Sequence, residues 1–305
     1  MGRGIVTNTV EDLAVRRATI QDYVELTKPR IIAMLVITAY CAMVVAGGRL
    51  PSLGITVAAL FGLALSTAGA HSINMWYDRD IDRVMSRTRR RPLVTGTIAP
   101  GRALVMGVLL EVVSIILLLW RVNVLTAIWS TAGFLFYVFI YTFWLKRRTP
   151  QNIVIGGAAG AFPPLVGWAA VTGQVSLAAW LMFLIIFLWT PPHFWALALY
   201  KRDDYQRAGV PMMPVVRGER STKWQSITYA GLLLVASLAL YWTHAVDWVY
   251  LAIALVIGVG FMAVHIPLLS EKLPDVRWAK RTFHMSLWYM TAIFFAMVAG
   301  SLWRY

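Results

Sequence analysis

The chain has 305 residues, of which 59% are hydrophobic, and its mean hydropathy is +0.66. A soluble domain of this length does not need so much apolar surface, so the composition excludes an ordinary soluble protein and favours one compact membrane domain. The formal net charge of +14 could indicate a nucleic-acid partner, but the basic residues lie in loops between apolar segments, and we therefore expect no nucleic acid.

The N-terminal segment, residues 1–27, precedes the apolar part of the chain. It contains charges of both signs and no apolar core with a cleavage site, so we expect neither a signal peptide nor a transit peptide. Nine apolar segments of membrane-spanning length follow. Their predicted ranges are 31–48, 53–77, 101–120, 123–143, 152–172, 177–200, 225–243, 248–268 and 283–302. The predicted fold is an all-α bundle of nine transmembrane helices that forms a single domain, residues 1–305.

Lysine and arginine are divided unevenly between the two sets of alternating loops. Of the 28 such residues, all except Arg49, Arg121 and Arg304 lie in the N-terminal segment or in the loops after the second, fourth, sixth and eighth segments. The positive-inside rule therefore places the N-terminus and these loops in the cytoplasm and, because the number of spans is odd, the C-terminus outside. We expect a multi-pass protein of the cell membrane. The single Cys41 excludes a disulfide framework and a cysteine-based metal site.

Oxygen-bearing side chains recur regularly after the second segment. Asn74, Asp78 and Asp82 are spaced by four residues, and each step turns a helix by about 400°, so all three fall within about 80° on one face. Hard oxygen ligands of this kind suit Mg²⁺, which prefers carboxylates, waters and substrate phosphates. The alternative is a solvated helix end with mixed charges. The position of the three residues at the mouth of a membrane helix favours the metal site.

Basic side chains surround this acidic face. Arginine forks bind phosphate oxygens, so arginines beside carboxylates that hold Mg²⁺ make a plausible diphosphate site. The alternative for these residues is ordinary anchoring at the membrane surface. The candidate diphosphate-binding residues are Lys28, Arg30, Arg83, Arg87, Arg90, Arg91, Lys146 and Arg147. All lie on the predicted cytoplasmic side against an apolar bundle, which suits a substrate with a charged head and a long apolar tail.

Several sequence blocks resemble the UbiA-type intramembrane prenyltransferases. One is the N-x-x-x-D-x-x-x-D motif at 74–82, followed by R-T-R-R-R-P-L at 87–93. Others are L-T-K-P-R at 26–30, T-P-P-H-F-W at 190–195 and D-Y-Q-R-A-G-V-P-M-M-P at 204–214. Together the blocks are most similar to the branch of this family that farnesylates haem B. The resemblance extends from about Leu26 to the last helix.

The resemblance implies an enzyme that transfers farnesyl from farnesyl diphosphate to the 2-vinyl group of haem B, with Mg²⁺ as cofactor. It also implies two acidic motifs that hold Mg²⁺ and diphosphate, the first of which corresponds to the motif at 74–82. The second is irregular, because Asp203 and Asp204 are adjacent and Arg207 and Ala208 stand where relatives have a second acid. Asp204 is preferred because it opens the D-Y-x-x-A-G-V-P run. The implied catalytic and metal-binding residues are Asn74, Asp78, Asp82 and Asp204.

The implied haem substrate draws attention to two histidines. His71 lies seven residues before Asp78, on the same helix face and about 10 Å deeper. His193 follows Pro191-Pro192, where we expect the sixth helix to loosen and line a cavity. Neutral imidazole is a common haem ligand, so either residue could bind the iron. The alternative is a hydrogen-bonded histidine between helices.

Two other functions remain open from the sequence. One is a prenyltransferase that acts on a quinone or chlorophyll precursor. The other is a transporter of haem or lipid, although a transporter is expected to have internal repeats and polar groups near the middle of the membrane. A haem A synthase or the assembly of a terminal oxidase is the expected destination of a farnesylated haem.

Overall fold

The computed structural model describes residues 17–303, and within them all regular structure is helical. Nine helical segments there are long and apolar enough to cross a membrane, which confirms the predicted fold class. The spans are α2 (Pro29–Gly47), α3 (Leu53–Tyr77), α5 (Pro100–Arg121), α6 with the π-helix η1 (Val124–Leu145), α7 with the 3₁₀ helix η2 and α8 (Asn152–Thr172), α9 (Leu177–Tyr200), α12 with η3 (Gly218–Thr243), α13 (Trp248–Ser270) and α14 (Arg277–Leu302). Arg3, Arg16 and Arg304 of the charge distribution lie outside the described residues.

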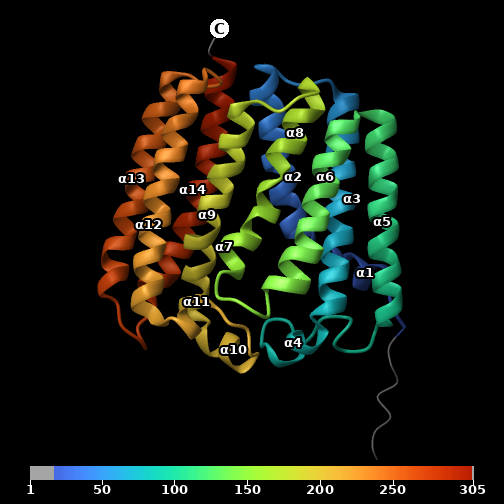
Figure 1. Ribbon diagram of the computed structural model, residues 1–305, viewed down its shortest axis with the longest axis vertical. Helices are drawn as coiled ribbons and strands as arrows, with labels where there is room; N and C mark the ends of the chain where they lie inside the picture. The colour runs from blue at the N-terminus through green and yellow to red at the C-terminus, as the bar shows by residue number, and fades with distance from the viewer. Residues whose placement is uncertain (1–16, 304–305) are drawn as a thin grey trace, which may run out of the picture.

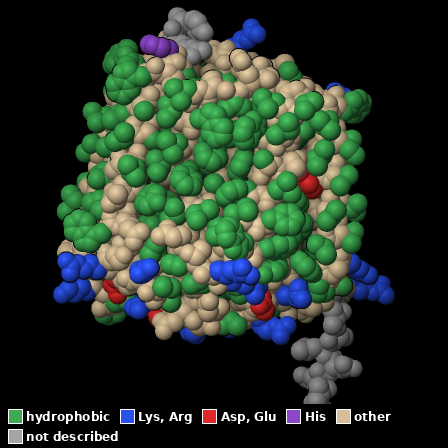
Figure 2. All heavy atoms as spheres, viewed as in Figure 1, with side chains coloured by type: hydrophobic (Ala, Val, Ile, Leu, Met, Phe, Trp, Pro, Cys, Tyr) green, Lys and Arg blue, Asp and Glu red, His purple; other side chains and the backbone are tan. Residues whose placement is uncertain are grey.

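The spans run side by side along the long axis of the molecule (Figure 1). The short helices α1 (Ile20–Thr27), α4 (Arg79–Val84), α10 (Arg202–Arg207) and α11 (Met213–Val216) gather near one end, and α14 finishes at the other. Figure 2 shows that hydrophobic side chains cover most of the visible face, while Lys and Arg concentrate near the end with the short helices. Charged loops and apolar spans are therefore separated in space as they are in the sequence.

Two helices begin earlier than predicted, α12 at Gly218 and α14 at Arg277. Their first turns are polar, so the helix starts before the apolar run that identifies a span. Buried polar contacts stabilise these turns. The Lys223 ammonium donates a hydrogen bond to the backbone carbonyl of Glu271, and the Glu271 carboxylate accepts one from the backbone N–H of Ala279 at 3.0 Å. That carboxylate thus satisfies a free donor at the start of α14.

The predicted loosening at Pro191-Pro192 is not found, because α9 is a continuous α-helix from Leu177 to Tyr200. Each proline removes one N–H donor, but α9 packs against α12 and α14 along its length, and this packing holds the helix together. Irregular backbone occurs instead in η1 (Phe136–Leu145) and η2 (Gly157–Ala161).

Small residues allow some helices to approach very closely. A Cβ atom on Gly167 of α8 (Pro163–Thr172) would lie 2.1 Å from the carbonyl oxygen of Ala39 in α2. A Cβ on Gly69 of α3 would lie 2.5 Å from the carbonyl oxygen of Gly107 in α5. Membrane helices associate through such backbone proximity, because lipid provides little hydrophobic force between them.

We expect Gly167→Ala to destabilise the protein by about 1–3 kcal/mol, the usual cost of overpacking, because α2 and α8 must move apart. The measurement is thermal unfolding in detergent. Gly54→Ala is the matched control, since no atom lies within 4 Å of the added Cβ. Equal melting temperatures for the two variants would contradict the close approach of α2 and α8.

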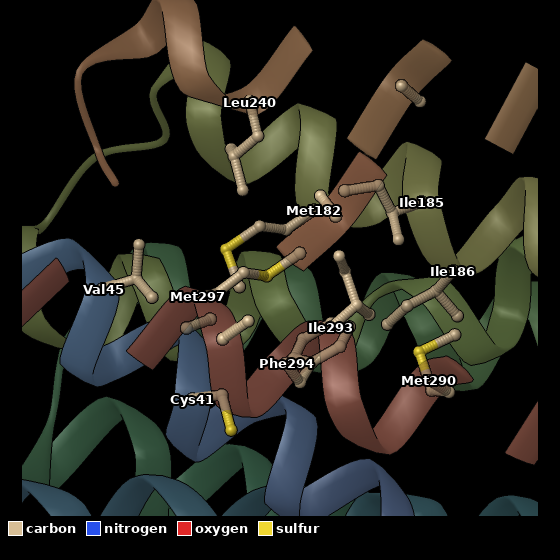
Figure 3. Packing of buried hydrophobic residues seen from close by; sticks show 14 of the residues in the cluster. Cys41, Val45, Met182, Ile185, Ile186, Leu240, Met290, Ile293, Phe294 and Met297 are labelled. Atoms are coloured by element: carbon tan, nitrogen blue, oxygen red, sulfur yellow. The ribbon is translucent and has the colours of Figure 1, made fainter. Parts of the chain in front are cut away.

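The apolar core lies between α2, α9 and α14. Figure 3 shows side chains from these helices meeting in one cluster, including Cys41 and Val45 of α2, Met182 of α9 and Met297 of α14. Unbranched methionines adapt to the irregular spaces between helices. This cluster fixes α9 relative to α14, which matters for the site because residues of both helices surround His193.

Candidate active site

A cavity of about 460 Å³ lies between the helices, beginning at the end that carries α4 and α10. Its volume is typical of a small-molecule site. The wall near this end is polar and contains Lys28, Asn74, Asp82, Arg87, Thr88, Arg91 and Lys146. The deeper wall is largely apolar and contains Met34, Leu35, Leu63, Phe134 and Phe162. The cavity thus has a charged mouth and an apolar interior.

The acidic motif lies at the junction of α3 and α4, with Asp78 between the two helices. Helical hydrogen bonding continues through the junction. The N–H of Asp78 donates to the Asn74 carbonyl at 2.9 Å, and the N–H of Asp82 donates to the Asp78 carbonyl at 2.8 Å. The residues of the motif therefore remain on consecutive helical turns. Asn74 and Asp82 line the cavity, whereas Asp78, the third residue of the predicted common face, does not.

Asp78 is fully buried behind the cavity wall. Its Oδ2 atom accepts a hydrogen bond from Asn74 Nδ2 at 2.7 Å and forms an ion pair with the Lys146 ammonium. Its Oδ1 atom lies 3.6 Å from Arg147 Nη2 and accepts no hydrogen bond from the described residues. Lys28 Nζ donates to Asn74 Oδ1 at 2.7 Å, so two lysines and the acidic motif form one network. The four-residue spacing identified the acidic motif, but it did not indicate that lysines from other segments bind Asn74 and Asp78.

The π-helix η1 places Lys146 in this network. The N–H of Lys146 bonds to the carbonyl of Tyr141, five residues earlier, at 2.9 Å, whereas an α-helix bonds residues four apart. In an α-helix Lys146 would be rotated about 140° from Tyr141. In the wider turns, Tyr137, Tyr141 and Lys146 all line the cavity. The Thr142 hydroxyl, which sequence reasoning missed, accepts from Asn74 Nδ2 at 3.1 Å.

Arg91 and Arg87 reach the cavity because the chain folds back after α4. Arg91 Nη1 donates to Asp82 Oδ2 at 2.6 Å, and the Thr88 hydroxyl donates to the Asp82 carbonyl at 3.0 Å. Asp82 is therefore held at both its side chain and its backbone. This ties the basic loop to the acidic motif, as the sequence order suggested.

Asp204 is held by residues outside the acidic motif at 74–82. Its Oδ2 atom accepts a hydrogen bond from the Ser86 hydroxyl at 2.6 Å and its Oδ1 atom pairs with Arg207, and these contacts lower the pKa of the carboxyl group. Asp204 is not among the residues that line the cavity. Between residues 17 and 303, no three His, Cys, Asp or Glu side chains gather into a group that could hold a metal ion. Arg207 thus occupies the place of a second acid and pairs with the first.

The predicted basic residues divide into two groups. Those that line the cavity are Lys28, Arg30, Arg87, Arg91 and Lys146. Arg83, Arg90 and Arg147 are not part of its wall. Burial lowers the pKa of Lys28 well below its usual value, and the nearby charges of Arg91 and Lys146 lower it further. An anion in the cavity would offset this crowding of positive charge.

Arg147 lies behind the acidic motif. It donates two hydrogen bonds of 2.7 Å to Asp80, and its guanidinium lies 4.5 Å from the centre of the Tyr77 ring. The hydrogen bonds from Arg147 lower the pKa of Asp80 to about 2. Asp80 lies outside the regular spacing, so sequence reasoning gave it no role. It holds the guanidinium beside Asp78.

Both candidate histidines line the cavity, and hydrogen bonds fix their tautomers. His71 Nδ1 lies 2.7 Å from the Thr27 carbonyl, which can only accept, so Nδ1 carries the proton. His193 Nδ1 lies 2.7 Å from the Ser286 hydroxyl, which donates its own proton to the Phe283 carbonyl at 2.6 Å. That hydroxyl therefore accepts from His193. In both rings Nε2 keeps a free lone pair, the form that binds iron.

Aromatic rings fix the plane of His193. Trp189 stacks on one face with its ring centre 4.2 Å away, and Phe283 stacks on the other at 4.7 Å. Phe283 and Ser286 belong to α14, about 90 residues further along the chain. No motif marks them, so sequence reasoning could not find them. His193 therefore makes the hydrogen bond between helices that the alternative interpretation expected, and it also lines the cavity.

A wall of small residues lies opposite α9. Gly156, Gly157 and Gly160 line the cavity, and a Cβ on Gly157 would lie 2.8 Å from Cβ of Thr190. Tyr205, which sequence reasoning did not single out, lines it too. Gly157 thus allows close packing against α9, whereas a Cβ on Gly160 would meet no atom within 4 Å, so this residue leaves room in the cavity.

Known proteins are similar to this chain in sequence and in architecture. A model of the UbiA prenyltransferase family matches residues 35–301. A protoheme IX farnesyltransferase from Symbiobacterium thermophilum is 57% identical over 92% of this chain and 93% of that protein. A structure of digeranylgeranylglyceryl phosphate synthase has a TM-score of 0.78 at 19% identity and covers 92% of this chain and 98% of its own. A UbiA homolog from Archaeoglobus fulgidus bound to DMAPP and Mg²⁺ has a TM-score of 0.65 at 18% identity, covering 91% and 99%.

The structural likenesses show a shared fold, and the family model and the sequence identity extend over nearly all of the chain. This chain belongs to the UbiA prenyltransferase family.

Proposed function

We propose that this enzyme transfers the farnesyl group of farnesyl diphosphate to the 2-vinyl group of haem B, giving haem O with its hydroxyethylfarnesyl side chain and releasing diphosphate. The observation that carries the proposal is the cavity, which joins a basic and acidic mouth to an apolar interior and to a rigidly held histidine. The relative from Symbiobacterium thermophilum, named for this activity, supports it.

The diphosphate head would lie among the cationic side chains at the mouth. Lys28, Arg87, Arg91 and Lys146 line this part of the cavity and can donate to diphosphate oxygens. Negative charge grows on the leaving group as the allylic C–O bond loosens, so fixed donors stabilise the transition state. The apolar interior holds the tail and keeps water from the allylic cation. Arg30 lines the cavity too, whereas Arg83, Arg90 and Arg147 would act over a longer distance.

The acidic motif fits a magnesium ion. Its donors are hard oxygens, and Asp78 Oδ1 is a buried carboxylate oxygen that accepts no hydrogen bond from the described residues. Asn74, Asp78 and Asp82 would hold the ion, and the family resemblance adds Asp204. When bound, Mg²⁺ neutralises negative charge on the departing diphosphate. The structure of the Archaeoglobus fulgidus homolog, which contains DMAPP and Mg²⁺, supports this assignment.

The haem would lie between the glycine wall and the two histidines. Nε2 of His193 or His71 would bind the iron, because both atoms keep a lone pair and both side chains line the cavity. Iron–imidazole bonding would hold the iron beside the histidine, and contact of the porphyrin edge with the cavity wall would then decide which vinyl group meets the farnesyl carbon. A haem A synthase or the assembly of a terminal oxidase would then use the product.

The test is incubation of the purified protein with haem B, farnesyl diphosphate and Mg²⁺, followed by mass analysis of the haem. We expect a product that has gained one farnesyl group and one hydroxyl group. A prenylated quinone precursor from a parallel incubation, with no change to haem, would favour the alternative prenyltransferase. Haem that moves across vesicle membranes unchanged would favour a transporter.

We also propose that residues 1–305 form one domain of the cell membrane whose N-terminal segment, residues 1–27, and active-site mouth face the cytoplasm. The distribution of Lys and Arg supports this orientation. A reporter fused after Gly218 should be cytoplasmic, and one fused after Tyr305 should be external. Reporters on the same side would contradict the proposed topology.

A further inference from the structure

Asn152 is a buried polar residue to which the mechanism above gives no role. It is the first residue of α7 (Asn152–Gly156), is only 1% exposed, and lines the cavity. Its Nδ2 atom donates to the Lys146 carbonyl at 3.3 Å. Because only the NH₂ group can donate to a carbonyl, this bond fixes the orientation of the amide. Oδ1 is then left as an acceptor without a partner among the described residues.

An acceptor buried without a partner is costly, and such atoms usually receive a hydrogen bond from water or a ligand. The described residues supply no donor to Oδ1, while Nδ2 is already bonded to the Lys146 carbonyl. The cavity that Asn152 lines can supply it. Asn152 Oδ1 is thus a buried acceptor without a partner among the described residues, on a side chain that lines the cavity.

The position of Asn152 joins the two halves of the site. On one side it contacts Lys146, which lies at the diphosphate end beside Asp78. On the other side, one helical turn later, Gly156 begins the wall of small residues, and Gly157 packs against Thr190 near His193. Asn152 therefore lies between the Lys146 end of the cavity and the wall of small residues, the two parts that the proposed function gives to farnesyl diphosphate and to haem.

The proposed reaction consumes water at this meeting point. The terminal vinyl carbon bonds to C1 of the farnesyl group while the C1–O bond breaks, and the electron pair leaves with diphosphate. A cation remains on the inner vinyl carbon, next to the porphyrin ring. A water oxygen then bonds to this carbon, and the proton that it loses passes to the released diphosphate. Without a positioned water, the cation loses a proton instead and gives a diene.

We propose that Asn152 Oδ1 holds the water molecule that becomes the hydroxyl group of haem O, an inference that rests on the proposed function. An amide oxygen suits this role because it accepts a hydrogen bond from water but is a weak base and a weak nucleophile. A carboxylate in its place would attack the cation or remove its proton. Asn152 is therefore a positioning residue, whose loss changes which product forms.

The experiment compares the products of Asn152→Leu with those of the unchanged protein, using haem B, farnesyl diphosphate and Mg²⁺ in isotope-labelled water. Leucine has a similar size and no acceptor. We expect farnesylated haem to form in both, and the ratio of diene to labelled haem O to rise about 10-fold in Asn152→Leu, the scale of one lost hydrogen bond to a reactant. Asn152→Ser, which restores a smaller acceptor, should return the ratio towards the original.

Thr38→Val is the matched control, because Thr38 also lines the cavity but its hydroxyl already donates to the Leu35 carbonyl at 2.8 Å. It should leave the product ratio unchanged. An unchanged ratio in Asn152→Leu would overturn the proposal. If Asn152→Leu and Asn152→Ser both make no farnesylated haem, the proposal is also overturned, because carbon–carbon bond formation should not depend on Asn152. If the unchanged protein forms no farnesylated haem, the proposed function itself fails.

Discussion

Replacing Asp78 by Asn is expected to lower farnesyl transfer at least about 100-fold, the scale of losing one fixed electrostatic partner of the transition state. The substitution keeps the shape of the side chain and removes its charge. Asp78 is fully buried, so the substitution also removes a buried negative charge beside Lys146 and Arg147. The measurement is turnover at saturating haem B and farnesyl diphosphate.

Asp80→Asn is the matched control for Asp78→Asn. Asp80 lies two residues away and binds the same guanidinium, but its side chain is 62% exposed. We expect turnover of this variant to stay within about threefold of the original, because exposed ion pairs contribute little. Both variants should retain their thermal unfolding transitions. Near-normal turnover in folded Asp78→Asn would contradict the metal-binding role of Asp78.

Replacing His193 by Ala is expected to weaken haem binding by more than about 10-fold and to change the absorbance spectrum of the bound haem, since the iron would lose its imidazole. Farnesyl diphosphate binding in the presence of Mg²⁺ should remain nearly normal, because the diphosphate end lies on other helices. Asp78→Asn should show the reverse pattern. The measurement is a pair of titrations, with haem and with farnesyl diphosphate, on both variants.

Ser286→Ala provides a finer control for the histidine. It removes the hydroxyl that accepts from His193 Nδ1 without touching the cavity side of the ring. Loss of such a supporting bond weakens a metal ligand without removing it, so haem binding should weaken less than in His193→Ala. An unchanged haem spectrum and affinity in His193→Ala would contradict its ligand role, and His71 would become the next candidate.

The fold was accessible from the sequence because membrane spans are marked by length and hydropathy alone. All nine spans found in residues 17–303 were predicted, and the errors concern their ends and interruptions. Arg277 and Gly218 begin helices whose first turns are too polar to be recognised as part of a span. A break was predicted at Pro191-Pro192 because proline lacks the N–H donor. The helix is continuous there, and it packs against α12 and α14.

The site was accessible only where its residues are close in sequence. The spacing of Asn74, Asp78 and Asp82 predicts a common face, and the structure brings Asn74 and Asp82 to the cavity wall. Partners from distant helices were out of reach, since neither Lys146 beside Asp78 nor Ser286 beside His193 follows from any local pattern. Asp204 was assigned by resemblance, and its binding of Mg²⁺ remains a prediction.

The wide turns of η1 make the active site depend on the number of residues in one span, apart from their chemistry. The fourth span has 22 residues, so deletion of a single residue between Phe136 and Leu145 leaves it long enough to cross the membrane. A deletion between Tyr141 and Lys146 would place these residues four positions apart, which an ordinary α-helix turns by about 400°, only about 40° beyond a full turn. Lys146 would then keep its direction without the wide turns, whereas the full-length segment, if it relaxed to an α-helix, would turn Lys146 away from Asp78 although no functional residue had been replaced. The number of residues in this segment therefore determines the direction in which Lys146 points relative to Asp78.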